Sequence, residues 1–149
     1  MKFSQEAYSV INKAIDYAEQ NKLEYITPEL LLLMLLTDAT FSTCFEECGG
    51  SVEILAKNLK EYINEYVEKE AKAKPEFSVG ASELLNHAGE SAYNSGSKEV
   101  CVRHLVHALW SLEESYTLYY MEQQGVTELA LLQEFANYED LADNAELIP

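Results

Sequence analysis

The stretch from Ile26 to Leu36, I-T-P-E-L-L-L-L-M-L-L, constrains the fold more than any other part of the chain. Thr27 suits the position that caps a helix, Pro28 suits the first helical position, and Glu29 would lie at the positive end of the helix dipole. No charge follows until Asp38. A helix that is apolar on every side must be buried, and this one is too short for a bilayer, which needs about 20 apolar residues. We therefore expect a central core helix.

A second stretch with the same plan follows 74 residues later, where Val100 to Trp110 reads V-C-V-R-H-L-V-H-A-L-W. Apolar residues of the two stretches fall on one another in three pairs, Leu31 with Leu105, Leu35 with Leu109, and Leu36 with Trp110. At the same spacing, one-sided helical positions upstream also match, Ala7 with Ala81, Ile11 with Leu85, Ala14 with Ala88, and Ala18 with Ala92. The sequence therefore indicates a duplicated unit.

We predict an all-α fold, in which two pseudo-symmetric four-helix repeats pack into one globular domain that spans residues 1–149. Repeat one covers about 1–75 and ends in a charged run, 68–74, before Pro75. Repeat two covers about 76–137, and residues 138–149 form an acidic, loosely ordered tail or linker. A helical repeat array is the alternative, but two copies favour a closed domain.

The remaining helices are expected from their apolar spacing and from the residues that stop them. Residues 4–21, 41–48 and 51–66 complete the first repeat, and Gly49-Gly50 separates its last two helices. In the second repeat, a polar connection at 94–99 precedes the second core helix, and 115–124 mirrors the short third helix. Gly125 stands near the position of Gly50. The last helix is expected to bury four residues, Val126, Leu129, Leu132 and Phe135.

The charge balance restricts the classes of partner. Ten Lys and Arg against 26 Asp and Glu give a formal charge of -16, and no Lys or Arg follows Arg103. Such a chain would repel the phosphates of nucleic acids and the surface of anionic membranes, whereas it attracts basic partners. The alternative is that the charge only maintains solubility. Three cysteines, Cys44, Cys48 and Cys101, without a signal peptide indicate reduced thiols and a cytoplasmic location.

The sequence offers little that indicates catalysis. It contains neither a G-x-x-x-x-G-K-[ST] motif nor a G-x-S-x-G motif, so we expect a chain that is not an enzyme, with no catalytic residue, cofactor or metal. The alternative is a metal-binding or small-molecule-binding helical protein that uses His87, His104 and His107. A cluster of Tyr116, Tyr119 and Tyr120 either forms an exposed patch for a partner or fills space between the two halves.

Two acidic residues near the first core helix are the best candidates for a binding site. Glu24 precedes the helix and Glu29 is in its first turn, so we expect the pair to lie close together at the surface, as an acidic spot for a basic partner. The alternative for Glu29 is stabilisation of the helix dipole, worth under about 1 kcal/mol.

The two core stretches and their flanks resemble the N-terminal domain of Clp-family ATPases, nearest to the ClpA type. The similar segments are Asn21 to Leu36 and Asn94 to Ser115, N-S-G-S-K-E-V-C-V-R-H-L-V-H-A-L-W-S-L-E-E-S, and the resemblance covers about Phe3 to Ala136. It implies a docking module on a hexameric unfoldase that feeds the ClpP peptidase and receives a ClpS-like adaptor and protein substrates. The positions used in that docking correspond here to Glu24, Thr27 and Glu29, and the isolated domain is expected to be a monomer.

Further details of the resemblance limit what this chain is expected to bind. In relatives of the ClpC type, a glutamate in the first turn of each core helix helps to read phosphoarginine. Glu29 fits the first of these positions but Arg103 occupies the second, so a symmetrical phosphoarginine reader is not expected. Leu23 stands where some ClpA domains have a zinc-binding histidine, which argues against that zinc site. A free-standing regulatory protein of the same family is the alternative to a docking module within a larger ATPase.

Overall fold

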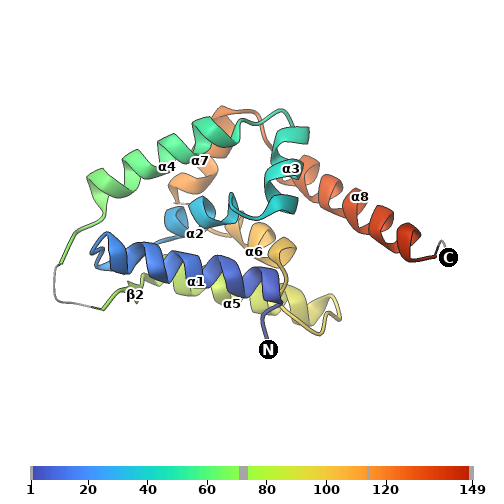
Figure 1. Ribbon diagram of the computed structural model, residues 1–149, viewed down its shortest axis with the longest axis horizontal. Helices are drawn as coiled ribbons and strands as arrows, with labels where there is room; N and C mark the ends of the chain where they lie inside the picture. Colours follow the sequence, from blue (N-terminus) through green and yellow to red (C-terminus); the bar gives the residue numbers. More distant parts are fainter. Residues whose placement is uncertain (1, 71–73, 114, 148–149) are drawn as a thin grey trace.

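The computed structural model describes residues 2–70, 74–113 and 115–147. Helices account for most of these residues, as predicted for an all-α fold. The first half of the chain, drawn from blue to green in Figure 1, contains α1 (Gln5–Gln20), β1 (Tyr25–Ile26), α2 (Pro28–Leu35), α3 (Ala39–Glu47) and α4 (Val52–Tyr66). The second half contains β2 (Glu76–Phe77), α5 (Val79–Asn94), α6 (Val102–Leu109), α7 (Tyr116–Gln123) and α8 (Glu128–Leu147).

Side-chain caps fix where several of these helices begin. The Ser4 hydroxyl accepts a hydrogen bond from the Ala7 backbone N–H at 3.1 Å, and Ser78 accepts one from Ala81 at the same distance. Each hydroxyl satisfies one of the backbone donors that a helix start leaves unpaired. The two caps are 74 residues apart, so the start of α5 repeats the start of α1.

The two halves are joined by a pair of short parallel backbone contacts that obey the same spacing. Phe3 pairs with Val100, and Ile26 pairs with Phe77 in the two-residue strands β1 and β2. The Ser4 N–H donates to the Val100 carbonyl at 2.9 Å, and the Ser78 N–H donates to the Ile26 carbonyl at 3.0 Å. Each half therefore begins by pairing with the segment that precedes the core helix of the other half. This reciprocal exchange confirms the predicted pseudo-symmetric arrangement.

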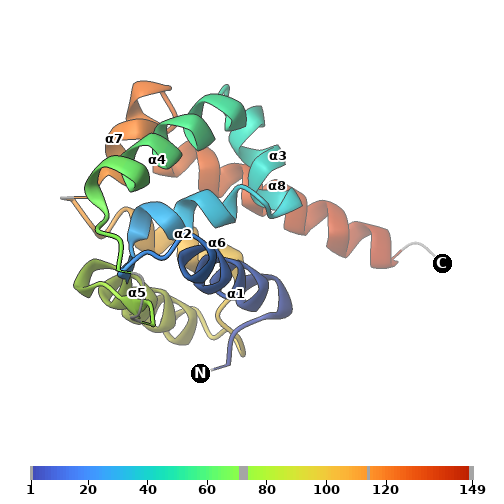
Figure 2. The same ribbon diagram turned by 60° about the vertical axis from the view of Figure 1, so that its left-hand side comes forward.

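The core helices lie in the middle of three layers. In Figures 1 and 2, α2 and α6 lie between a layer of α1 and α5 on one side and a layer of α4 and α7 on the other. Every residue of α2 is buried, as its composition predicts. Buried apolar residues from both halves form one continuous cluster, so the two repeats share a single core.

The second core helix differs from the first, because it is not buried on every side. Arg103 on α6 is half-buried and His107 is exposed, whereas their counterparts on α2, Glu29 and Leu33, are both buried. The His107 Nδ1 lies 2.8 Å from the Glu128 Oε1 on α8. α6 is therefore one-sided, with a polar edge that faces α8.

Three further details differ from the sequence-based expectations. Leu84 is the fully buried leucine of α5, while Leu85 only packs against the core from its edge. Leu129, expected in the core, is 69% exposed, and Leu131 is buried in its place. The reason is that α8 begins at Glu128, so Val126 lies outside the helix. The helix is therefore not constrained to bury the residues that share a face with Val126 in a continuous helical repeat.

The C-terminal segment and the glycines that follow the third helices also differ from the sequence-based expectations. α8 continues to Leu147, so the expected loose tail is helical over residues 138–147, and the last part of this helix extends away from the three layers (Figure 1). Gly49 and Gly125 directly follow the C-caps of α3 and α7, and both have a left-handed backbone, at φ 88° and 75°. Gly49 rather than Gly50 is therefore the counterpart of Gly125. Of the predicted charged run 68–74, residues 71–73 lie outside the described residues, as do 148–149 of the predicted tail.

No single helix in the described ranges has the length and apolarity to cross a membrane. The pair α2 and α3 meets the length and composition together, but the two helices meet at an angle of 90°.

Candidate functional site

Thr27 and Glu29 occupy the start of α2, where the sequence places a candidate binding site. The Thr27 hydroxyl accepts a hydrogen bond from the Leu30 backbone N–H at 3.2 Å and so caps the helix. Pro28 follows at the first helical position, where its missing N–H has no intrahelical partner to lose. The local sequence therefore fixes both the start of α2 and the direction in which its first side chains point.

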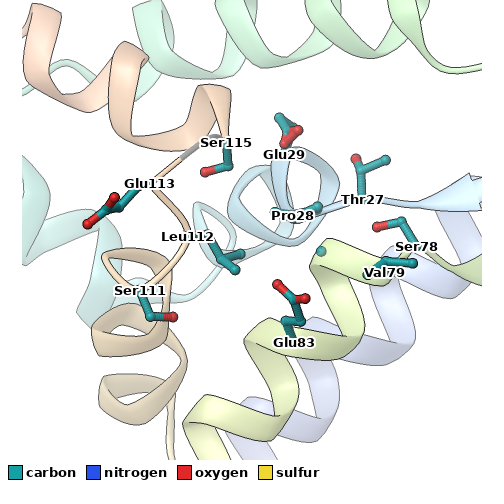
Figure 3. A pocket seen from close by; sticks show the side chains of 11 residues that line it. Thr27, Pro28, Glu29, Ser78, Val79, Glu83, Ser111, Leu112, Glu113 and Ser115 are labelled. Carbon is teal, nitrogen blue, oxygen red and sulfur yellow. The ribbon is translucent and has the colours of Figure 1, made fainter.

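A groove of about 520 Å³ opens beside this helix start, and we call it the acidic groove (Figure 3). Its walls are the first turn of α2, the first turns of α5 and the connection from α6 to α7, so both halves of the chain contribute. Gly80 lets α5 approach closely, because a Cβ at this position would lie 3.2 Å from the Pro28 Cγ. The lining residues are Thr27, Pro28, Glu29, Ser78, Val79, Gly80, Glu83, Ser111, Leu112, Glu113 and Ser115.

Among the described residues, three carboxylates and no Lys or Arg line the acidic groove. The carboxylates are those of Glu29, Glu83 and Glu113. In Figure 3, Glu83 points from α5 toward Pro28 and Leu112, which form an apolar floor. Hydroxyl groups of serine and threonine complete the rim. An apolar floor with a few acidic groups suits a side chain that has an apolar stem and a cationic end.

Glu29 is buried, with 5% of its surface exposed, and not at the surface as the sequence suggested. The Tyr62 hydroxyl of α4 interacts with the Glu29 carboxylate, because α4 packs directly over α2. Among the described residues, the second carboxylate oxygen, Oε2, has no hydrogen-bond partner. Burial raises the pKa of Glu29 to about 7, although its backbone N–H and the Tyr62 hydroxyl oppose the shift. Near neutral pH this group is therefore present in both protonation states.

Glu24 does not line the acidic groove. It is half-buried beside β1, and its backbone N–H donates to the Glu68 carbonyl at 2.9 Å. Partial burial, followed by the negative charges of Glu68 and Glu70, raises the pKa of Glu24. The structure thus brings Thr27 and Glu29 together in the groove and places Glu24 in a separate acidic edge.

Sequence reasoning missed Glu83, Glu113 and Tyr62 as parts of this region. Glu83 is in a helix whose spacing to α2 is set only by tertiary packing, and Glu113 is in a connection without periodicity. A signal for Tyr62 existed, since it falls on the apolar face of α4 and its hydroxyl needs a polar partner when it is buried.

The three histidines make separate contacts. His104 is buried, its Nδ1 accepts a hydrogen bond from the Cys101 backbone N–H at 2.8 Å, and burial lowers its pKa. His107 faces Glu128, and His87 lies 3.7 Å from Glu90. Within the described residues, no group of three His, Cys, Asp or Glu side chains is placed to hold a metal ion. Nothing in these contacts favours the metal-binding alternative.

The pseudo-symmetry gives the acidic groove a counterpart beside α6, which we call the arginine hollow. It has a volume of about 380 Å³ and lies between the starts of α6 and α1, the connection from α2 to α3, and α8. At the 74-residue spacing, Cys101 replaces Thr27 and Arg103 replaces Glu29. The lining residues are Ser4, Glu6, Asp38, Thr40, Glu99, Cys101, Val102, Arg103, Phe135 and Tyr138.

Comparisons with known proteins agree with this architecture. The N-terminal domain of Hsp104 from Candida albicans superimposes with a TM-score of 0.78 at 15% identity, covering 90% of this chain and 89% of that one. The N-terminal domain of the ClpV1 ATPase from the E. coli EAEC Sci1 type VI secretion system gives a TM-score of 0.73 at 17% identity, covering 89% and 82%. Both likenesses concern the fold.

A likeness in sequence also exists. The chaperone protein ClpB of Chlamydia pneumoniae is 31% identical over 115 residues, which are 74% of this chain and 13% of ClpB, so the chain spans a small part of that relative's length. The family model of the Clp repeat (R) N-terminal domain matches residues 2–124. Because that match covers most of the chain, the chain belongs to the Clp repeat N-terminal domain family.

Proposed function

We propose that this domain is a docking module, without catalysis of its own, through which a Clp-family ATPase receives adaptors or protein substrates. The observation that carries the proposal is the acidic groove, in which the buried Glu29 keeps one oxygen without a partner among the described residues. A lysine or arginine from a partner would pair with the exposed carboxylates of Glu83 and Glu113 in the same groove. The net charge of -16 would attract such a partner over longer range.

The finer form of the proposal is a ClpA-type module in the cytoplasm. There the domain would receive a ClpS-like adaptor for an unfoldase hexamer that works with ClpP. Thr27 and Glu29 would form the centre of the contact, and Glu24 would lie at its edge, since the structure places it outside the groove. Membership of the Clp family supports the general role, and the acidic lining supports a basic contact residue.

Titration of the domain with a ClpS-like adaptor from the same cell tests this proposal, with the affinity measured by calorimetry. Glu29→Lys is expected to weaken binding by about 1–3 kcal/mol, which is roughly a fivefold to 150-fold rise in Kd, because it reverses one close ionic contact. Glu29→Gln should have a smaller effect of the same sign and keeps the size of the buried side chain. Glu24→Ala should have the smallest effect.

Glu19→Lys is the matched control, since Glu19 is exposed near the end of α1 and the substitution changes the net charge equally. Circular dichroism and thermal unfolding would show that each variant is folded. Equal weakening by Glu19→Lys and Glu29→Lys would mean that only long-range charge matters and that the site is wrong. If the folded wild type binds neither the adaptor nor an unfolded substrate, the docking role itself is wrong.

A further inference from the structure

Five of the ten tyrosines gather on one surface, formed by α4 and α7, which are far apart in the sequence. We call this surface the tyrosine cluster; its members are Tyr62, Tyr66, Tyr116, Tyr119 and Tyr120. Tyr116 is central, with ring centroids 4.9 Å from Tyr62, 6.0 Å from Tyr119 and 6.1 Å from Tyr120. Tyr66 stacks on Tyr116 at 6.4 Å with an angle of 15° between the rings. The rings therefore form one continuous aromatic surface.

The outer rings of the tyrosine cluster are open to solvent, while the inner ones form its base. Tyr66, Tyr119 and Tyr116 are 62%, 53% and 46% exposed, whereas Tyr62 and Tyr120 are half-buried. Filling space between the two halves would bury all five rings, so that interpretation explains only the base. Large aromatic rings gathered at an exposed surface are typical of a binding site.

The outer rings also form the wall of a hollow of about 520 Å³, lined by Glu113, Ser115, Tyr116 and Tyr119. Glu113 and Ser115 line the acidic groove as well. The two hollows therefore lie next to each other, with Glu113 and Ser115 on the border between them.

Negative charge surrounds the tyrosine cluster on several sides. Glu113 lines the hollow, and the Glu29 carboxylate interacts with Tyr62 at the base of the cluster. Burial raises the pKa of Tyr62 to about 12, and the Glu29 carboxylate adds to this. Burial, then other tyrosines and Glu61, raise the pKa of Tyr120. The faces of the rings carry negative potential too, so the surface as a whole is complementary to a cation.

We propose that the tyrosine cluster binds an arginine side chain of a docked protein segment, with the guanidinium in the hollow beside Tyr116 and Tyr119 and its charge facing Glu113. The two rings stand at 75° to each other, so the guanidinium stacks on the face of one while the other borders its edge. A guanidinium fits better than an ammonium because it is flat and weakly hydrated, so it can stack on a ring while its edge donates to a carboxylate. A second copy of this chain is a poor occupant, since two molecules of charge -16 repel each other. The inference rests on the proposed function for the source of the segment.

Titration of the full chain with a twelve-residue Gly/Ser peptide that carries two arginines tests the inference. NMR would follow the tyrosine ring resonances, and fluorescence anisotropy of the labelled peptide would give the affinity. The same peptide with citrulline keeps the shape of arginine but loses the charge, and should bind between about fivefold and thirtyfold more weakly. The affinity of the same peptide with two lysines should lie between those of the arginine and citrulline peptides.

Tyrosine variants test whether the ring faces themselves bind the arginine peptide. The double substitution Tyr116→Ala with Tyr119→Ala should lower the affinity for the arginine peptide at least tenfold. Tyr116→Phe with Tyr119→Phe should retain most of the affinity, because the ring faces remain. Tyr8→Ala with Tyr93→Ala is the matched control, since these tyrosines are 58% and 75% exposed on α1 and α5. It should leave the affinity unchanged.

The inference is overturned if arginine and citrulline peptides bind equally, if the control pair loses as much affinity as the cluster pair, or if the cluster resonances shift with protein concentration alone. Glu83→Gln distinguishes it from the proposed function, because Glu83 lines only the acidic groove. Adaptor binding that depends on Glu29 and Glu83 but not on the tyrosines supports docking and contradicts the arginine site. Arginine binding at the cluster by a domain that takes no adaptor supports the arginine site and contradicts docking.

Discussion

The acidic groove and the arginine hollow are built from the same backbone plan but carry different chemistry. Each lies at the start of one core helix, beside the start of the first helix of the other repeat. In the acidic groove Glu29 is buried under Tyr62, while in the arginine hollow the equivalent residue is Arg103, which is half-buried. The comparison teaches that duplication preserved the architecture of a site while its charged residues changed. The arginine hollow has its own acids, Glu6, Asp38 and Glu99, but it carries Arg103 at the position of Glu29.

The two core helices differ for a related reason. Leu33 of α2 is buried, but its counterpart His107 faces Glu128 of α8. α2 is covered by other elements on all sides, whereas one edge of α6 reaches the surface beside α8. The two repeats are therefore equivalent in their cores and different in their surfaces, and the following predictions test both parts of that statement.

The largest effect is expected in the shared core. Leu35→Ala and Leu109→Ala remove equivalent leucines that are 1% and 0% exposed. Each should lower the free energy of unfolding by about 2–5 kcal/mol, because the cavity left in a close-packed core collapses only in part. Urea unfolding, followed by circular dichroism and Trp110 fluorescence, checks this. Since the repeats share one core, we expect one transition in both variants; two separate transitions would show that the repeats fold independently.

Glu29→Gln tests the buried carboxylate that distinguishes the first repeat. The pKa of Glu29 is about 7 in the folded chain against an ordinary value of 4.5, so between these values the folded state holds a proton that the unfolded state has lost. The contribution of Glu29 to the free energy of unfolding is therefore fully present below about pH 4.5 and is lost as the pH rises through 7. Relative to Glu29→Gln, the wild type should lose up to about 3 kcal/mol over that range.

Urea unfolding at several values between pH 5 and pH 8 measures this difference, with Glu19→Gln as the exposed control for other titrating groups. A difference between wild type and Glu29→Gln that stays constant with pH would show that Glu29 is solvated in solution.

The helix caps should behave alike in the two repeats. Ser4→Ala and Ser78→Ala each remove a hydroxyl that accepts from a backbone N–H at 3.1 Å. Each substitution should cost about 1 kcal/mol in the free energy of unfolding, as is typical for an N-cap. Thermal unfolding of the two variants side by side checks this, and a cost confined to one of them would mean that the equivalence of α1 and α5 ends at the backbone.

The smallest effect is expected from Arg103→Glu, which gives the arginine hollow the acid found in the acidic groove. Reversal of this partly exposed charge is expected to be worth about 0.3–1 kcal/mol, so the affinity for a basic peptide should rise about twofold to fivefold. Calorimetry with the arginine peptide measures this. A much larger gain would show that the two sites are interchangeable, and a loss of affinity would show that Arg103 itself supports binding.

Much of the fold could be predicted from the sequence because its signals are local. The all-apolar run from Leu30 to Leu36 can only be a buried helix, and the spacing of 74 residues repeats it. Ser4, Thr27 and Ser78 mark helix starts through short-range hydrogen bonds. Leu129 was predicted wrongly because the face that a helix buries depends on the residue at which the helix begins.

The candidate site could be predicted only in part. Local sequence placed Thr27 and Glu29 at the start of α2, but it could not show that Tyr62 covers Glu29 or that Glu24 lies elsewhere. It could not bring Glu83 and Glu113 to the same groove, or join tyrosines of α4 and α7 in one surface. Helix periodicity is determined by neighbours within a few residues, and so the sequence alone determined the elements and their duplication. Burial, charge environment and the joining of distant side chains depend on how helices pack, and so only the tertiary structure decided the chemistry of the sites.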